Sequence, residues 1–224
     1  MSGSAYRDLA EVLKDDRFPR IDLDLRRGRH IGREDGEDYV FLMDALKQLE
    51  PFYLRFHCQL VSKADGYVYL LPTGSALPRR TLSVGEMLVG QTLALMCLDP
   101  ATLNRKKVVT REALLQRLEG LVGAKTLIRA LNPRLKKRID ERVGAEKVRR
   151  KVQEALRNLH KLGFIELERD RFTLRNSLLR FSEPVRDLGD REAALERLIE
   201  AGEVRRRDLP GLSRPAAESA EASG

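Results

Sequence analysis

The sequence has few of the residues that would mark a membrane, secreted or redox protein. It has no tryptophan, only 5% aromatic residues and two cysteines among its 224 residues. Cys58 and Cys97 each lie in apolar surroundings, which predicts buried free thiols and not a disulfide framework. The longest apolar-rich stretch, 87–98, is shorter than the roughly 18 residues that cross a bilayer. Residues 1–16 also lack the apolar core of a secretory signal. We therefore expect a cytoplasmic chain with no membrane partner.

Catalytic and metal-binding signatures are equally scarce. The sequence has three histidines, none at metal-ligand spacing from another histidine or a cysteine, and it has no phosphate-loop or nucleophile-elbow motif. A hydrolase built on His57 and Cys58 is one alternative, although a histidine beside a buried thiol is the simpler interpretation. We predict that the chain is not an enzyme and binds no metal or cofactor, so any ATPase activity would come from a partner.

Charge is abundant, and its distribution is uneven. The net charge is +8, but residues 125–180 hold 17 Lys and Arg against 7 Asp and Glu, a net of +10. Residues 1–124 have a net charge of +1 and residues 181–224 a net charge of −3. A basic block on an otherwise balanced chain is typical of proteins that bind a phosphate backbone. The alternative is a solvated face that is rich in lysine and arginine.

The N-terminal half predicts short helices followed by a β-hairpin. Helical periodicity of apolar residues predicts helices over 5–16, 22–29 and 39–56. Phe18-Pro19 is expected to end the first helix, and Pro51 to kink or break the third. Asp65-Gly66 supplies the positive φ of a tight turn, so we expect a hairpin of strands 59–62 and 67–71. Helices followed by a hairpin is the order of a winged-helix domain.

The C-terminal half predicts the same order again. Ser83 and Glu86 form a capping-box pattern before a helix that runs to Leu98, and Thr110 caps a second helix that ends near residue 121. An amphipathic helix follows over 145–162, with Gly163 as its C-cap. A second hairpin is expected over 164–168 and 171–175, and a further short helix over 191–201.

The predicted fold class is therefore mainly α with small β-hairpins (α+β), arranged as tandem winged-helix domains. The expected division is an N-terminal winged-helix domain over 1–72, a linker over 73–82, a C-terminal winged-helix domain over 83–182 with its basic helix at 145–162, a helical extension over 183–209 and a disordered tail over 210–224.

The helix 145–162 is the candidate DNA-binding element. On a helical wheel four of its cations lie within about 80°, and its apolar residues lie on the opposite side. In a helix-turn-helix unit this third helix is the one that enters the major groove. Glu154 interrupts the basic strip and should pair with a cation one turn away, while Asn158 offers a hydrogen bond to DNA. Arg169 and Arg175 would extend the surface onto the hairpin. The predicted DNA-binding residues are Lys147, Arg149, Arg150, Lys151, Arg157, Lys161 and Arg171.

Several segments resemble the MukE-like family. They are Phe18-Pro19, 25–32 (LRRGRHIG), 41–44 (FLMD), 48–53 (QLEPFY), 66–70 (GYVYL), Leu82-Ser83 and 87–90 (MLVG). The same order continues more weakly through Lys151-Val152, Leu162-Gly163 and Arg180-Phe181. The resemblance covers roughly residues 15–200, whereas 125–142 and the tail from Pro210 depart from the family pattern.

This resemblance implies a tandem winged-helix accessory subunit of a MukBEF-type bacterial condensin. Its expected partners are the kleisin MukF, the SMC-like ATPase MukB through the complex, double-stranded DNA and a second copy of the chain. The implied role is chromosome condensation, organisation and segregation, in the cytoplasm and nucleoid. We assign the nearly neutral N-terminal half to protein contacts, which exposed apolar side chains would mark. The alternative is a dimeric winged-helix transcription regulator, which would bind one operator far more tightly than random DNA.

Overall fold

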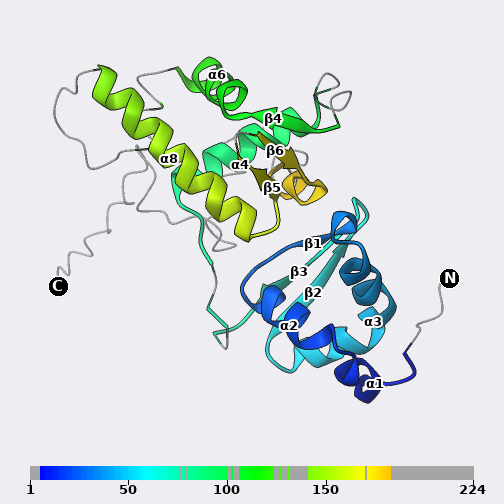
Figure 1. Cartoon of the computed structure of the whole chain (residues 1–224). Coiled ribbons are helices and arrows are strands. Elements are labelled where there is room, and N and C mark those ends of the chain that lie inside the picture. The colour runs from blue at the N-terminus through cyan, green and yellow to red at the C-terminus, as the bar shows by residue number, and fades with distance from the viewer. Residues whose placement is uncertain are drawn as a thin grey trace, which may run out of the picture.

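The computed structural model describes residues 6–75, 77–78, 80–99, 102, 106–123, 127, 131, 141–169 and 171–182. Two hydrophobic cores organise these residues. One core runs from Val12 to Leu70 and the other from Leu82 to Phe181. We call the described residues around the first core the N-terminal unit and those around the second the C-terminal unit. Figure 1 shows the two units side by side, the first in blue and cyan and the second in green and yellow.

The N-terminal unit packs three helices on a small antiparallel sheet. Its elements are α1 (Leu9–Lys14), α2 (Phe18–Arg26), β1 (Ile31–Gly32), the 3-10 helix η1 (Arg33–Asp35), α3 (Glu37–Leu54), β2 (Cys58–Lys63) and β3 (Tyr67–Pro72). The sheet order is β1-β3-β2. The predicted hairpin is confirmed, since β2 pairs with β3 and Gly66 takes a φ of +88° in the turn. The third strand, β1, was not predicted.

The two predictions that rested on proline are met only in part: α1 ends at Lys14, before Phe18-Pro19, and α3 does not break at Pro51. Phe18-Pro19 belongs to the start of α2, where a proline needs no backbone partner, so it begins a helix as well as following one. Pro51 lies inside α3, which continues to Leu54. The missing hydrogen bond falls in the last turn on the exposed side, while the opposite side of α3 is anchored by buried residues such as Leu42 and Leu49.

The C-terminal unit has a similar composition of helices and strands. Its elements are α4 (Val84–Cys97), β4 (Val108–Thr110), α6 (Arg111–Val122), α8 (Glu141–Lys161), β5 (Ile165–Glu168), β6 (Arg171–Leu174) and the 3-10 helix η2 (Asn176–Ser182). The sheet order is β4-β6-β5. The Ser83 and Glu86 capping box and the Thr110 cap are confirmed. The chain is thus a mixed α+β protein. The predicted helix 191–201, the extension 183–209 and the tail 210–224 lie outside the described residues.

The buried face of α8 completes the second core. Val148, Val152, Leu156 and Leu159 are all buried, and α8 packs against α4. The helix ends at Lys161, and Gly163 follows with a φ of +75°, which suits glycine. A Cβ there would stand only 2.1 Å from the carbonyl oxygen of His30, so glycine also permits the close approach of the N-terminal unit.

Polar contacts join the two units. The backbone N–H of His30 donates to the carbonyl of Leu162 (2.8 Å), and Asn176 donates from its backbone to Glu34 (3.1 Å) and from its side chain to the carbonyl of Asp65 (2.9 Å). Arg175 donates to both carboxylate oxygens of Asp35 at 2.9 Å.

The position of Arg175 corrects one prediction. We expected it to extend the basic surface along the hairpin, but it is buried in this contact between the units, where it pairs with Asp35 and Glu166. Burial of a guanidinium requires carboxylate partners: Glu166 comes from the same hairpin, nine residues away, and Asp35 from the other unit, 140 residues away.

Candidate nucleic-acid interface

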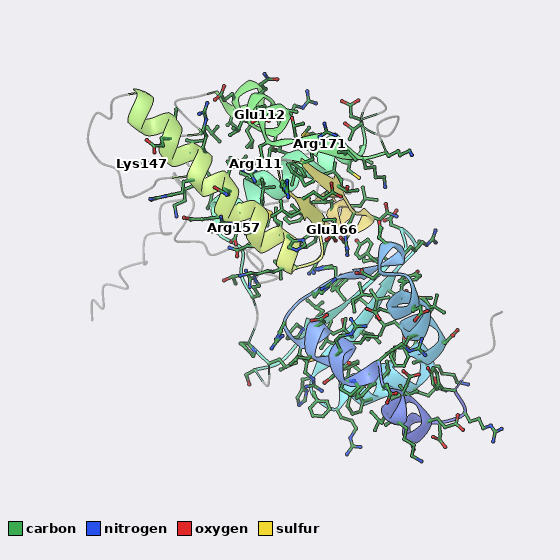
Figure 2. The ribbon with its side chains drawn as sticks, viewed as in Figure 1. Arg111, Glu112, Lys147, Arg157, Glu166 and Arg171 are labelled. Carbon is green, nitrogen blue, oxygen red and sulfur yellow. The ribbon has the colours of Figure 1, made fainter. Side chains whose placement is uncertain are left out.

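The solvent side of α8 carries the predicted basic strip. Arg149, Arg150, Arg157 and Lys161 are exposed, and Lys147 and Lys151 are half-buried. Figure 2 shows Lys147 and Arg157 projecting from α8. Six of the seven predicted DNA-binding residues therefore share one helix. We refer to these six residues (Lys147, Arg149, Arg150, Lys151, Arg157 and Lys161) as the α8 strip.

The seventh predicted residue, Arg171, stands on β6 and is exposed. It is opposite Thr110 of β4 and Glu168 of β5 in the sheet register. A residue that the sequence did not single out joins this region, because Arg111 at the start of α6 donates to the carbonyl of Arg169 (2.7 Å). The bond ties α6 to the turn between β5 and β6. The sequence predicted that a helix starts after Thr110, but it could not predict this hydrogen bond, because Arg111 and Arg169 are 58 residues apart.

Glu154 modulates the charge of the strip. It accepts a hydrogen bond from Lys151 (2.6 Å), which is the main reason that its pKa lies below the usual value, and it lies 4.0 Å from Arg150. We expected the partner to be Arg150, Arg157 or Lys161; Arg150 is close to Glu154, but the hydrogen-bonded partner is Lys151, which was not predicted. Lys147, Arg149, Arg157 and Lys161 form no ion pair within the part of the chain that the structure describes, so their charge is directed to solvent.

Asn158 does not offer its amide to a ligand as the sequence suggested. Its Nδ2 donates to Oε1 of Glu86 at 2.8 Å, and this contact fastens α8 to the N-terminal end of α4. The same Glu86 carboxylate closes the capping box with Ser83. The side chain therefore belongs to the packing of the unit, and the α8 strip consists of long cations alone.

The His57 and Cys58 pair lacks the arrangement of a nucleophile and base. Burial raises the pKa of the Cys58 thiol, which donates to the carbonyl of Phe56 (3.4 Å). A buried thiol with a raised pKa is protonated and unreactive. Among the described residues, no three His, Cys, Asp or Glu side chains cluster as metal ligands. The described helices also include none with the length and apolar character that crossing a membrane requires.

Comparison with known proteins places the chain. The MukE-like family model matches residues 6–222. The chain belongs to the MukE-like family. It is 35% identical over 200 residues to the chromosome partition protein MukE of Pectobacterium atrosepticum, covering 88% of this chain and 85% of that protein. The protein of the same name from Shigella flexneri is 34% identical and is covered to 88%, and that from Escherichia coli K12 is 34% identical and is covered to 84%.

The segment 25–32, one of those on which the resemblance to the MukE-like family rested, lies at the contact between the units. Residues 25–32 span the end of α2 and the short strand β1, and they include His30, which meets Leu162. The exposed large apolar side chains of the N-terminal unit lie elsewhere. On α3 they include Val40 (54% exposed) and Leu54 (56% exposed).

Proposed function

We propose that this MukE-like chain is a non-enzymatic accessory subunit of a MukBEF-type condensin, and that it binds the kleisin MukF and double-stranded DNA. Through the complex it acts with the SMC-like ATPase MukB in chromosome condensation, organisation and segregation, in the cytoplasm at the nucleoid. Membership of the family supports the role in chromosome partition. The observation that carries the DNA contact is the α8 strip, four of whose six cations (Lys147, Arg149, Arg157 and Lys161) form no ion pair with the residues that the structure describes.

The order of elements supports a tandem winged-helix architecture. In each unit helices precede a hairpin, β2–β3 or β5–β6, and a short third strand completes the sheet. In the C-terminal unit α8 directly precedes the hairpin, which is the position of the recognition helix in winged-helix proteins. We propose winged-helix domains over 1–72 and 83–182, joined by a linker over 73–82 and followed by an extension over 183–209 and a tail over 210–224.

The chemistry of the α8 strip favours phosphates over bases. Lysine and arginine side chains neutralise backbone charge, and reading a base needs placed donors and acceptors. Of the two side-chain amides on this helix, Asn158 and Gln153, Asn158 is held by Glu86. We therefore propose that the strip binds duplex DNA without regard to sequence, and that exposed Arg171 on β6 adds to this surface.

Charge reversal of the α8 strip tests this assignment. We expect the full chain with Arg150→Glu, Arg157→Glu and Lys161→Glu to bind a 30-base-pair duplex at least tenfold more weakly. We also expect a shallower salt dependence, because each lost phosphate contact removes about 0.9 from the slope of log K against log salt. Fluorescence anisotropy at two salt concentrations measures both quantities.

A second charge-reversed chain serves as the control. Lys14→Glu, Lys47→Glu and Arg55→Glu change the net charge equally at exposed positions of the N-terminal unit. This control should keep the wild-type affinity, and thermal melts should show both variants folded. If the two triple variants lose affinity equally, or the strip variant loses none, the assignment of the strip is wrong.

We propose that the exposed apolar side of α3 is the homodimer contact. Val40 and Met43 stand one turn apart on this helix and are both exposed. The N-terminal half is nearly neutral, which suits a protein contact better than a DNA contact, and exposed apolar side chains in that half would mark the contact. Light scattering should show a dimer for the wild-type chain and a monomer for the Val40→Asp, Met43→Asp variant. The matched pair Leu95→Asp, Leu98→Asp on the C-terminal unit should remain dimeric, and a dimeric α3 variant would exclude this face.

A further inference from the structure

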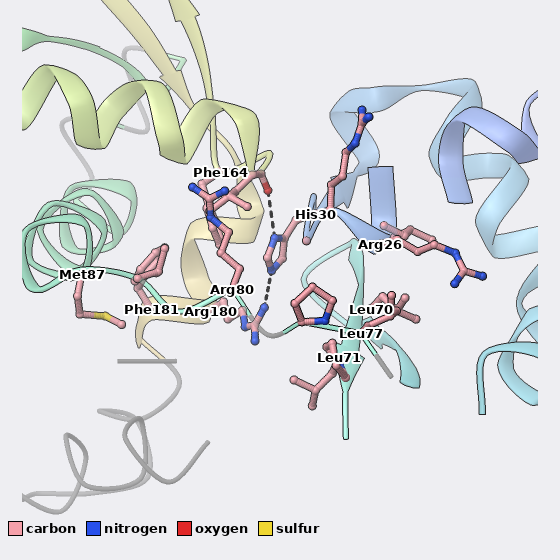
Figure 3. Close-up of a pocket in the computed structure, with 17 residues that line it drawn as sticks. Arg26, His30, Leu70, Leu71, Leu77, Arg80, Met87, Phe164, Arg180 and Phe181 are labelled. Carbon is pink, nitrogen blue, oxygen red and sulfur yellow. Dashed lines mark hydrogen bonds between the residues drawn. The ribbon is translucent and has the colours of Figure 1, made fainter. Parts of the chain in front are cut away.

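A pocket opens where the two units meet. Its cavity volume is about 110 Å³. This is below the roughly 300–1,000 Å³ of clefts that enclose a whole small ligand, and it suits a single side chain of a larger partner. Its walls come from three parts of the chain: the ends of α2 and β3, the stretch after β3 that contains Leu77 and Arg80, and the C-terminal unit at Met87 and Phe181. Figure 3 shows these side chains around His30, whose ring bonds to Leu162 and Arg180.

The pocket combines an apolar floor with positive charge. Leu70, Leu77, Met87 and Phe181 contribute apolar surface from both units and from the stretch between them. Four arginines also line it, and its described lining contains no aspartate or glutamate. Asp22 beside Arg26 and Glu86 near Arg80 lie outside this lining and compensate part of its charge, so the lining itself stays positive.

Two of the four arginines are held by the fold. Arg26 donates to Asp22 (2.8 and 2.9 Å) and lies over the ring of Phe56, whereas Arg180 donates to Nε2 of His30 (2.7 Å) and lies 4.0 Å from the ring centroid of Tyr69.

The other two arginines are exposed. Arg27 makes no ion pair among the described residues, and the guanidinium of Arg80 lies 4.0 Å from Glu86, beyond hydrogen-bond distance. Arg27 belongs to the wall at the end of α2 and Arg80 to the wall after β3, so their charges come from two different walls.

This pattern specifies the chemistry of the occupant. A ligand that satisfies both Arg27 and Arg80 needs negative charge on each side of an apolar group. A duplex backbone would leave the apolar floor unfilled, and an amphiphile with a single head group would place its charge at one wall only. An extended peptide with a leucine-like side chain between carboxylates meets both requirements. We propose that the pocket binds an acidic, leucine-bearing segment of a protein partner.

The proposed site is distinct from the α8 strip and does not depend on DNA binding. It draws residues from both units, so the occupant would contact the N-terminal and C-terminal units at once. It rests on the proposed function only in assuming that the chain works beside a protein partner.

Photo-crosslinking in the native cell identifies the occupant. The full chain carries benzoylphenylalanine in place of Leu77, and the control carries it in place of Leu95, which is exposed on α4 outside the pocket. We expect position 77 alone to crosslink to one partner peptide that is net negative and contains leucine-like side chains. A crosslink to residues 183–224 of the same chain, to a second copy of the chain, to lipid or to a non-acidic peptide would overturn the proposal. The absence of any crosslink would overturn it as well.

A binding titration with the identified peptide then tests whether Arg27 and Arg80 contribute to its affinity. The crosslinked sequence is synthesised with a fluorescent label and titrated with the full chain. Arg27→Gln with Arg80→Gln should raise its Kd at least tenfold, while replacing the central apolar residue of the peptide with serine should weaken it similarly. Neutral glutamine avoids placing negative charge at the C-terminal end of α2. An unchanged Kd in the arginine variant overturns the proposal. The strip variant Arg150→Glu, Arg157→Glu, Lys161→Glu should bind the peptide normally, so failure of the DNA assignment is recognised separately.

Discussion

At the scale of single residues, His30 shows how burial fixes a protonation state. Its Nδ1 faces the carbonyl of Leu162 (3.1 Å), which can only accept, and its Nε2 faces the guanidinium of Arg180 (2.7 Å), which can only donate. The ring is therefore neutral with its proton on Nδ1. Burial, with the charge of Arg180 adding to it, lowers the pKa of His30 well below 6.5.

This shift predicts a pH dependence of stability. In the unfolded chain His30 takes up a proton below about pH 6.5, whereas in the folded chain it stays neutral. The unfolded state then binds more protons, so the free energy of unfolding falls by up to about 1.4 kcal/mol for each pH unit below 6.5. Urea denaturation at pH 7.5, 6.5 and 5.5 measures the slope, and His30→Gln should flatten it. Equal slopes in the two chains would contradict the neutral buried ring.

At the scale of helices and strands, neighbouring side chains of α8 have different roles. Arg157 points its charge to solvent, whereas Asn158 is bonded to Glu86 of α4. We expect Asn158→Ala to lower the free energy of unfolding by about 1 kcal/mol and to leave the Kd for duplex DNA unchanged. Arg157→Ala should do the reverse, with a higher Kd and unaltered stability. If the Asn158 variant binds DNA more weakly under conditions where it is folded, the Asn158 amide contacts DNA and this prediction is wrong.

Local sequence chemistry predicted the boundaries of several elements. The Ser83 and Thr110 caps and the Asp65-Gly66 turn each depend on residues close together in the chain, and the structure confirms all three. The strands β1 and β4 have two and three residues, too few to show an alternating pattern, so they were missed. The break expected at Pro51 failed because burial of one face of α3 outweighs a local propensity.

At the scale of the whole molecule, the contact between units was beyond local patterns. Arg175 and Asp35 are 140 residues apart, and nothing near either residue marks it as buried. The sequence therefore suggested that Arg175 belongs to the basic surface. The segment 25–32, which carries the family resemblance, turns out to supply His30 to this contact. The sequence showed that this segment resembles a family, but it did not show that the segment contacts the C-terminal unit.

The ion pair between Arg175 and Asp35 leads to a prediction about cooperativity. Their side chains are 9% and 7% exposed, and removing one partner of such a pair leaves the other charge buried. We expect Asp35→Ala to cost about 3 kcal/mol, because Glu166 alone remains beside Arg175. Since the pair joins the two units, calorimetry should show one unfolding transition for the wild-type chain and two for the variant.

Asp35 also accepts hydrogen bonds within its own unit, from Arg29 (3.0 Å) and from the backbone N–H of Gly32 (2.9 Å). A double-mutant cycle separates the loss of the pair from the loss of these bonds. Arg175→Met in the Asp35→Ala background removes the stranded guanidinium, so the double variant should recover part of the lost stability while still unfolding in two transitions. The surface pair Arg20 and Asp38 lies within the N-terminal unit and provides the comparison. Arg20→Ala should cost less than about 1 kcal/mol and keep the single transition. A single transition in Asp35→Ala would mean that the hydrogen bonds of His30 and Asn176 are enough to couple the units.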